Sequence, residues 1–273
     1  MSWNPVTGCH NGCDYCYARV NARRFDTHKT DQLVKHEVDG HIAYEATAKC
    51  SPYPAGFLPT LYRHRLDEPL TRRKPARIFT VSMGDLWSPG VPTDWVDDVV
   101  AVALNAPWHR FYFLTKRPDR LREWRKRTTY DLTGLGSHLW FGVSITGPAD
   151  RWRLGELAVT DLPHRWLSYE PYQSYLNLRG YREVDRTGGV EWVVLGGLTG
   201  RKPAGVPPET LDKIVLDVLD DREADDDVPI WVKTNVHEGA LGMNPFMMIR
   251  RAEGHLRVYP VKRQARDGLG EGE

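Results

Sequence analysis

Cysteine and methionine are scarce in this chain, long apolar runs are missing, and neither sign of charge is in excess. The 273 residues hold four Cys and five Met, with 37 Lys and Arg against 36 Asp and Glu. A mean hydropathy of -0.52, with no apolar run near the roughly 20 residues that span a bilayer, excludes an integral membrane protein. The start of the chain lacks the basic and apolar segments of a secretory signal, so we expect a cytoplasmic protein with reduced thiols.

The near-zero net charge hides a segregation of charge along the chain. Residues 110–127 hold eight Lys and Arg against two Asp and Glu, and residues 63–77 hold six against two. Residues 217–227 hold seven acids and one Arg. Solvated helix faces explain such runs, unless the basic segments border one pocket, in which case they would form a track for a polyanion.

Short β-branched or aromatic runs alternate with helical patterns from residue 77 onward, which is typical of βα units around a parallel sheet. We therefore predict an α/β fold, a full or partial (β/α) barrel of about six to seven parallel strands. The predicted strands are 77–82, 110–115, 139–145, 165–169, 191–195 and 230–234, with a short first strand at 2–4. The predicted helices are 93–105, 117–127, 149–157 and 208–219.

Residues 26–76 interrupt this alternation, because they carry His, Pro and Arg with little sustained periodicity. We interpret them as an insertion after the first helix, acting as a lid or a substrate-recognition segment. Residues 1–261 then form a single barrel domain, and the Gly- and charge-rich residues 262–273 a disordered tail.

Three of the four cysteines lie close together near the start of the chain. Cys9, Cys13 and Cys16 have the spacing C-x3-C-x2-C on a Gly-containing loop. Soft thiolates suit iron, and one such loop can bind three irons of a [4Fe-4S] cluster. The fourth iron then stays open, and the amine and carboxylate of a cofactor could chelate it.

This motif resembles that of the radical S-adenosylmethionine superfamily, in which an aromatic residue precedes the last Cys, as Tyr15 does here. The segments WNPVTGC, GCDYCYA and FLTKRP, with a Glu-Pro pair after a strand, resemble a narrower branch found in phage and prophage genomes. The resemblance implies a TIM-barrel-like domain, a [4Fe-4S] cluster, S-adenosylmethionine and an external electron donor of the flavodoxin or ferredoxin type. The enzyme would generate a 5'-deoxyadenosyl radical that abstracts hydrogen from a substrate.

The resemblance also implies that S-adenosylmethionine lies across the carboxyl ends of the strands. The segment Ser82, Met83, Gly84 and Asp85 follows one strand in the place of the family's Gly-Gly-Glu-type motif, and Asp85 would accept hydrogen bonds from the cofactor's ammonium. Further cofactor contacts are predicted for Ser144, Arg151, Glu170, Gly196 and Gly197, with Arg153 as a second partner for the carboxylate. Leu198 and Thr199 depart from the branch, in which an acid follows those glycines. Lys116, Arg117 and Lys233 are predicted to bind an anionic substrate.

Other interpretations of the same residues stay open. Cys9, Cys13 and Cys16 with Cys50 could form a structural zinc site, with His10 as another ligand, in a nucleic-acid-binding protein without radical chemistry. The cluster is favoured because zinc knuckles usually pair two C-x2-C turns, and Cys50 stands alone, as a buried small residue would. For the substrate, a nucleic acid undergoing repair or modification is favoured over a peptide or a small metabolite. No residue identifies the reaction outcome.

Overall fold

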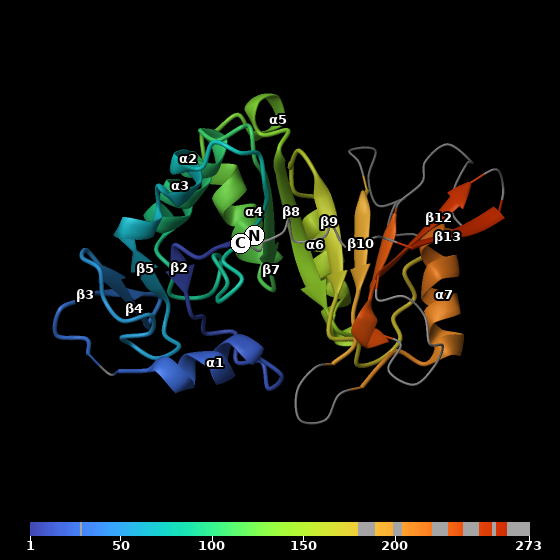
Figure 1. Ribbon diagram of the computed structural model, residues 1–273, viewed down its shortest axis with the longest axis horizontal. Coiled ribbons are helices and arrows are strands. Elements are labelled where there is room, and N and C mark those ends of the chain that lie inside the picture. The colour runs from blue at the N-terminus through green and yellow to red at the C-terminus, as the bar shows by residue number, and fades with distance from the viewer. Residues whose placement is uncertain are drawn as a thin grey trace, which may run out of the picture.

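The protein is built on one large sheet that curls into a half-barrel (Figure 1). The computed structural model describes residues 1–27, 29–179, 189–198, 204–219, 229–236, 246–252 and 255–260. Nine strands form this sheet in the order β1-β6-β7-β8-β9-β10-β11-β12-β13, and neighbours from β1 to β11 pair in parallel. The predicted α/β fold with a partial barrel of seven parallel strands is therefore confirmed.

The predicted strands agree closely with the observed ones. The parallel strands are β1 (Ser2–Trp3), β6 (Arg77–Thr80), β7 (Arg110–Thr115), β8 (Leu139–Ile145), β9 (Arg165–Tyr169), β10 (Trp192–Leu195) and β11 (Ile230–Lys233). An antiparallel hairpin, β12 (Phe246–Ala252) and β13 (His255–Pro260), extends the sheet beyond β11. Sequence analysis did not predict this hairpin.

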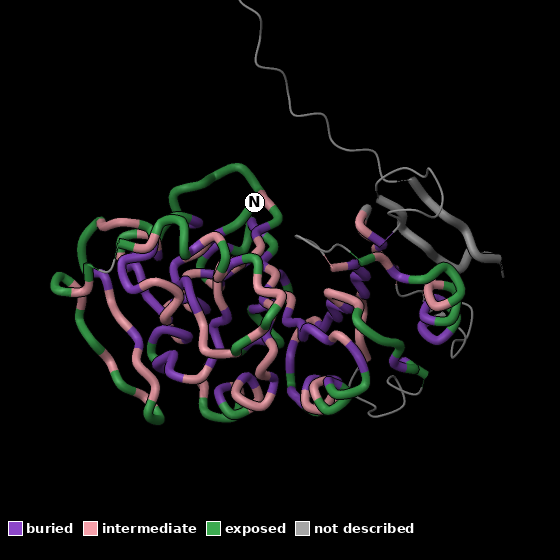
Figure 2. The backbone as a smooth tube through the Cα atoms, turned by 90° about the horizontal axis from the view of Figure 1, so that it is seen from below, coloured by how far each residue is buried: buried purple, intermediate pink, exposed green. Residues whose placement is uncertain are grey.

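The helices between the strands pack on the outer face of the half-barrel. They are α3 (Thr93–Leu104), α4 (Pro118–Arg127), α6 (Arg151–Ala158) and α7 (Pro208–Leu219), with the short α5 (Leu132–Leu135). The start of the predicted helix 149–157 is a 3-10 turn, η2 (Pro148–Asp150). Buried residues of these helices, such as Trp95 and Leu121, share one core with Phe111, Phe113 and Phe141 of the strands. Figure 2 shows buried residues along the strands and exposed residues on the outer turns.

The insertion contributes a second sheet rather than an irregular segment. After α1 (Tyr17–Phe25) come β3 (Val34–Val38), β4 (His41–Ala46) and β5 (Thr60–Tyr62), which join β2 (Val6–Thr7) in the order β2-β5-β4-β3. The short η1 (Arg63–Arg65) and α2 (Glu68–Thr71) lead back to the large sheet. Sequence analysis missed these strands because they are short and largely polar, as VKHEV of β3 shows.

Some expectations fall outside the described residues, namely the tail 262–273, Thr199 and most of the acidic segment 217–227. Asp217, the acidic residue of that segment that the structure describes, is buried at the end of α7 and accepts hydrogen bonds from Tyr175 and Arg179. Its charge is therefore paired within the fold. Within the described ranges, no helix has the length and apolar character needed to cross a membrane.

Candidate functional site at the carboxyl edge of the sheet

The three-cysteine loop lies at the carboxyl ends of the parallel strands. Because β1 is parallel to β6, the loop that follows β1 and β2 reaches the same edge as the loops after β6 to β11. In Figure 1 the arrowheads of β8 and β9 point towards the side on which α1, the helix after the loop, is drawn. Active sites of (β/α) barrels are built at this edge. We call the cysteine loop with the ends of β1, β6 and β7 the near half of the mouth, and the ends of β8 to β11 the far half.

Backbone and amide hydrogen bonds anchor the cysteine loop to the segment after β6. The backbone N–H of Gly8 donates to the carbonyl of Met83 at 2.8 Å. The Asn4 side-chain oxygen accepts from the Ser82 hydroxyl at 3.1 Å and from the Met83 N–H at 2.9 Å. The segment Ser82 to Gly84, predicted to contact the cofactor, therefore also holds the cysteine loop. Sequence analysis missed Asn4.

The loop also passes too close to the inserted sheet for any residue but glycine at position 8. Gly8 has a φ of +79°, and a Cβ there would lie 2.6 Å from the carbonyl oxygen of Phe57 and would overlap that of Leu58. A Cβ on Gly84 would lie 2.6 Å from the carbonyl oxygen of Gly8. The adjacent Cys9 N–H donates to Phe57 O at 3.1 Å, so the insertion supports the loop from the other side.

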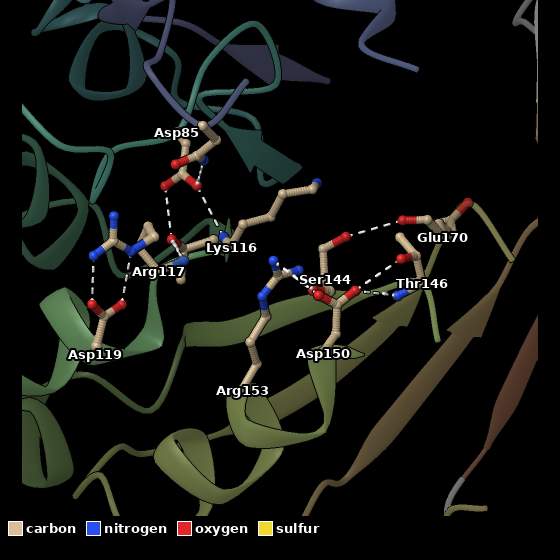
Figure 3. A network of polar contacts seen from close by, with 11 residues as sticks. Asp85, Lys116, Arg117, Asp119, Ser144, Thr146, Asp150, Arg153 and Glu170 are labelled. Atoms are coloured by element: carbon tan, nitrogen blue, oxygen red, sulfur yellow. Dashed lines mark hydrogen bonds and ion pairs between the residues drawn. The ribbon is translucent and has the colours of Figure 1, made fainter. Parts of the chain in front are cut away.

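Asp85 is a buried carboxylate whose hydrogen-bonding capacity is taken up by the protein. Its Oδ1 accepts from Thr115 Oγ1 at 2.7 Å and from the Trp87 N–H at 3.1 Å. Its Oδ2 accepts from Asn11 Nδ2 at 2.7 Å and from the Lys116 N–H at 2.9 Å. A carboxylate offers about four acceptor positions, so Asp85 ties the cysteine loop to the end of β7 (Figure 3). The predicted ammonium contact would have to compete with these four bonds.

The three thiols of the loop influence one another electrostatically. Burial raises the pKa of the Cys9 thiol to about 12, and negative charge on Asp85, Cys16 and Cys13 contributes further. Cys16 caps α1, because its sulfur accepts from the Arg19 N–H at 3.3 Å. Cys50 lies elsewhere, in the inserted segment, where its thiol donates to the carbonyl of Ser51.

We tested whether this donor set suits the predicted metal. Within the described part of the chain, no three His, Cys, Asp or Glu side chains are arranged so that they could hold a metal ion. A single zinc ion needs its ligands around one point, whereas thiolates of a [4Fe-4S] cluster bind different irons of a cube. Three thiols on one anchored loop are a donor set that suits a cluster, because each thiolate would bind a different iron. The cluster stays a prediction.

Two tyrosines reach from the cysteine loop towards the far half of the mouth. Burial raises the pKa of Tyr15, as do negative charges on Cys13 and Asp150, while the Arg153 cation lowers it. Burial also raises the pKa of Tyr17, with contributions from Cys16 and Glu170. The Tyr17 hydroxyl donates to Ser82 O at 2.6 Å. These interactions show that the loop faces the ends of β8 and β9 across the mouth.

The end of β8 carries a polar cluster drawn in Figure 3. The Ser144 hydroxyl donates to Glu170 O at 3.0 Å, and the Ser144 carbonyl accepts from Arg153 Nη1 at 2.8 Å. Asp150 accepts from the Thr146 N–H and hydroxyl and pairs with Arg153 at 3.0 Å. In the part of the chain that the structure describes, Arg153 Nε is buried without a hydrogen-bond partner. Arg151 is exposed at the first turn of α6. Sequence analysis missed Asp150, although an acid at a helix start after a strand is a usable signal.

Glu170 and Lys233 meet although β10 lies between their strands. Lys233 Nζ lies 2.5 Å from Glu170 Oε1, and the Ser168 hydroxyl donates to Glu170 Oε2 at 3.0 Å. The space beside Gly196 is filled by the Glu170 carboxylate, which a Cβ there would overlap. A Cβ on Gly197 would lie 2.6 Å from the carbonyl oxygen of Asn235, whose own Nδ2 donates to Gly197 O. The two predicted glycines thus permit close packing of the far half.

The predicted substrate cations and the basic residues beside them differ in whether an acidic side chain of the described residues pairs with them. Arg117 makes a two-point contact with Asp119, at 3.0 and 2.6 Å. Arg120, Arg122 and Arg125 pair with Asp39, Glu156 and Asp161. Lys116 is instead half-buried, with its ammonium 5.7 Å from the centre of the Tyr15 ring.

The two basic segments do not border the mouth together. Arg77 and Arg110 begin β6 and β7, so the segment 63–77 leads to the amino edge of the sheet, opposite the cysteine loop. Lys116, which follows β7, reaches the mouth, and Arg65 Nη1 of the first segment donates to Asn4 O at the end of β1. Because Arg77 and Arg110 lie at the opposite edge, the two segments as wholes do not form the combined track along the mouth that the sequence suggested. A cavity of about 280 Å³ lies outside the mouth, between α4 and the turn at Asp39, and contains none of the predicted site residues.

The fold and the loop define an α/β half-barrel protein with three cysteines at the carboxyl edge of its parallel strands. The chain belongs to the family described as "Protein of unknown function (DUF5131)", whose model matches residues 1–237. That match covers both sheets up to the end of β11. No curated protein and no solved structure matches the chain.

Proposed function

We propose that this protein is a radical S-adenosylmethionine enzyme. The observation that carries the proposal is a three-thiol loop that Asn4 and Asp85 anchor at the open end of a half-barrel. When bound there, a [4Fe-4S] cluster would supply one electron to S-adenosylmethionine, breaking the bond from sulfur to the 5' carbon and leaving methionine and a 5'-deoxyadenosyl radical. An external flavodoxin or ferredoxin would replace the electron.

The chain's own residues would bind the cofactor and keep it apart from water. Cys9, Cys13 and Cys16 would hold three irons, and their protons would leave on binding, because thiolate is the ligand. The far half offers Glu170 and Ser144 for the cofactor's hydroxyls and Arg153, whose buried Nε has no partner among the described residues, for its carboxylate. Asp85 would act as a positioning residue for the loop.

The substrate that we propose is a nucleic acid, with a peptide or a small metabolite as the alternatives. Support comes from Lys116, which has no carboxylate partner among the described residues and points its ammonium at Tyr15 of the cysteine loop. An unpaired cation beside the reacting centre suits an anionic substrate.

The decisive test is anaerobic reconstitution followed by analysis of metal and sulfide. About four irons and four sulfides per chain are expected, and the Ala variants of Cys9, Cys13 and Cys16 should each lose them. Cys50→Ala is the matched control and should keep its iron. One zinc per chain in freshly purified protein, with no cluster after reconstitution, would contradict the proposal and favour the zinc alternative.

Turnover provides the second measurement. Protein that holds the cluster and has been reduced by dithionite should convert S-adenosylmethionine to methionine and 5'-deoxyadenosine. Loaded, reduced protein that neither binds nor cleaves the cofactor would show that the cluster has another task.

A further inference from the structure

The inner face of the half-barrel carries aromatic side chains that do not belong to the core. Residues alternate between the two faces of a strand, and Ile78, Phe111 and Phe141 lie in the core shared with the outer helices. Their neighbours Phe79, Tyr112, Trp140, Trp166 and Trp192 are absent from that core and lie on the opposite face. All but Trp166 are partly exposed.

These rings form one continuous surface across five strands, which we call the aromatic face. Trp166 and Trp192 stack with centroids 5.1 Å apart, and Tyr112 meets Trp192 at 5.5 Å. Tyr112 and Trp140 are register partners on β7 and β8, with centroids 6.1 Å apart. The Nε1–H of Trp140 is buried and has no acceptor among the described residues. The Trp140 ring also stacks on His164, with centroids 4.5 Å apart, so a base would have to stack on the other side of that ring, and likewise on the side of Trp192 away from Trp166. The face therefore combines aromatic rings with a donor that has no acceptor in the described part of the chain.

Two arginines border the aromatic face at the amino edge of the sheet. Arg77 and Arg110 are register partners, each two residues before Phe79 or Tyr112 on its strand, and therefore on the same face. Both are exposed, and within the described ranges neither guanidinium has an ion-pair partner. This distinguishes them from Arg117, Arg120, Arg122 and Arg125 of the segment 110–127, which are paired with acids.

We propose that the aromatic face binds single-stranded nucleic acid, with phosphates at Arg77 and Arg110 and bases stacked on Tyr112, Trp140 and Trp192. Aromatic rings beside free cations are the usual combination in such sites. A duplex does not fit this surface, because its base faces are already stacked on one another. The proposal depends on the proposed function only for the role of the bound nucleic acid as a substrate. From Arg110 along β7 to Lys116 is roughly 20 Å at about 3.3 Å per residue, so a bound strand would lead to the mouth.

The experiment measures binding of a fluorescein-labelled oligothymidylate, and of the matching oligouridylate, by fluorescence anisotropy with the full chain before cluster loading. Both should bind at low salt, and the annealed duplex should bind more weakly. Tyr112→Leu and Trp192→Leu should each weaken binding roughly 5- to 150-fold, the range expected from losing one base-stacking ring. Trp152→Leu, on an exposed tryptophan of α6, is the matched control and should bind as the wild type does.

Salt dependence tests the arginines. The double variant Arg77→Gln, Arg110→Gln should reduce the slope of log K against log salt by about 1.4, because each single-strand phosphate contact contributes about 0.7. The double variant Arg122→Gln, Arg125→Gln removes the same charge from the helix side and should leave the slope unchanged. Equal slopes for all three proteins would contradict the phosphate contact.

Two further measurements separate folding and chemistry from binding. Trp192→Phe keeps a ring and should retain most of the affinity, which distinguishes lost stacking from a misfolded variant; thermal melts followed by circular dichroism check each protein. Wild type that binds neither oligonucleotide at low salt would overturn the inference even if it cleaves S-adenosylmethionine. Binding without any iron–sulfur cluster would instead leave the inference standing and overturn the proposed function.

Discussion

The two halves of the mouth differ in how their carboxylates are bonded. In the near half, Asp85 receives four hydrogen bonds and Asn4 receives two, so the cysteine loop is anchored at several points. In the far half, Glu170 pairs with Lys233, whose side chain is 44% exposed. Buried polar atoms without partners among the described residues occur in both halves, at Asn11 Oδ1 and Arg153 Nε for example, so they do not distinguish the halves. A buried carboxylate with four donors fixes a geometry, whereas a partly exposed ion pair can exchange a partner for a ligand. We therefore expect the near-half carboxylate to hold the loop and the far-half carboxylate to bind.

The largest expected effect comes from removing the centre of the near half. Asp85→Ala leaves the buried Thr115 hydroxyl, the Asn11 amide and two backbone donors without their acceptor. We expect a loss of about 3 kcal/mol in the free energy of unfolding, measured by urea denaturation, together with lower iron retention. Asp119→Ala, which removes the partner of Arg117, should cost less than about 1 kcal/mol. Equal losses of unfolding free energy in the two variants would show that Asp85 stabilises the fold no more than a surface carboxylate does.

Two glycines of the cysteine loop separate backbone strain from crowding. Gly8 and Gly12 both have positive φ, but a Cβ on Gly12 meets no atom of the described residues within 4 Å, whereas one on Gly8 would overlap the backbone of Phe57 and Leu58 in the inserted segment. Gly12→Ala should cost about 1–2 kcal/mol, the penalty of the left-handed conformation. Gly8→Ala should cost about 2 kcal/mol more, because the backbone must move. Urea titrations of both variants check this, and similar midpoints would show that the insertion does not press on the loop.

The far half should respond in affinity rather than in stability. Glu170→Gln breaks a partly exposed ion pair with Lys233, so the free energy of unfolding should change by less than about 1 kcal/mol. Binding of S-adenosylmethionine by the cluster-loaded protein should weaken about tenfold, the size of one lost charge-assisted hydrogen bond. Equilibrium dialysis measures it, with Glu156→Gln on α6 as the control. Unchanged affinity would show that Glu170 faces the cofactor without binding it.

The smallest expected effect is a pH dependence of the metal-free protein. Burial raises the pKa of Cys9 from 9.0 to about 12. Above pH 9 the unfolded chain loses this proton while the folded chain keeps it, so this contribution to stability is complete below pH 9 and is lost as the pH rises. Between pH 8 and pH 10 the loss should be about 1 kcal/mol. Cys9→Ser should show a shallower decline than wild type in denaturation at each pH, and parallel curves would contradict the assignment.

The parallel strands could be predicted from the sequence because each is short and apolar or aromatic, and because helices follow β6, β7, β8 and β10. The inserted sheet could not, since β2 has two residues and β3 is polar, and both depend on tertiary pairing. Nothing in the long parallel series that precedes it predicts the antiparallel hairpin β12–β13.

Local sequence also identified most of the residues that meet at the mouth, because parallel strands bring their carboxyl ends to one edge. It did not reveal their partners. The link from Asp85 to Asn11 joins residues 74 apart in the sequence. Lys233 and Glu170 are likewise far apart in the sequence, and only the fold brings them together. Nor did it separate the paired arginines of α4 from Arg110, which has no ion-pair partner in the described ranges.

The sequence by itself determined the seven-stranded α/β half-barrel and the three-thiol loop, because the local periodicity of apolar residues and the spacing of the cysteines are enough to predict them. Only the tertiary structure decided what surrounds that loop: an anchored near half, a far half with a partly exposed ion pair, and a sheet face lined with rings. The physical reason is that hydrogen-bond partners, close backbone approaches and exposed faces depend on which distant segments pack together, and no local pattern records that.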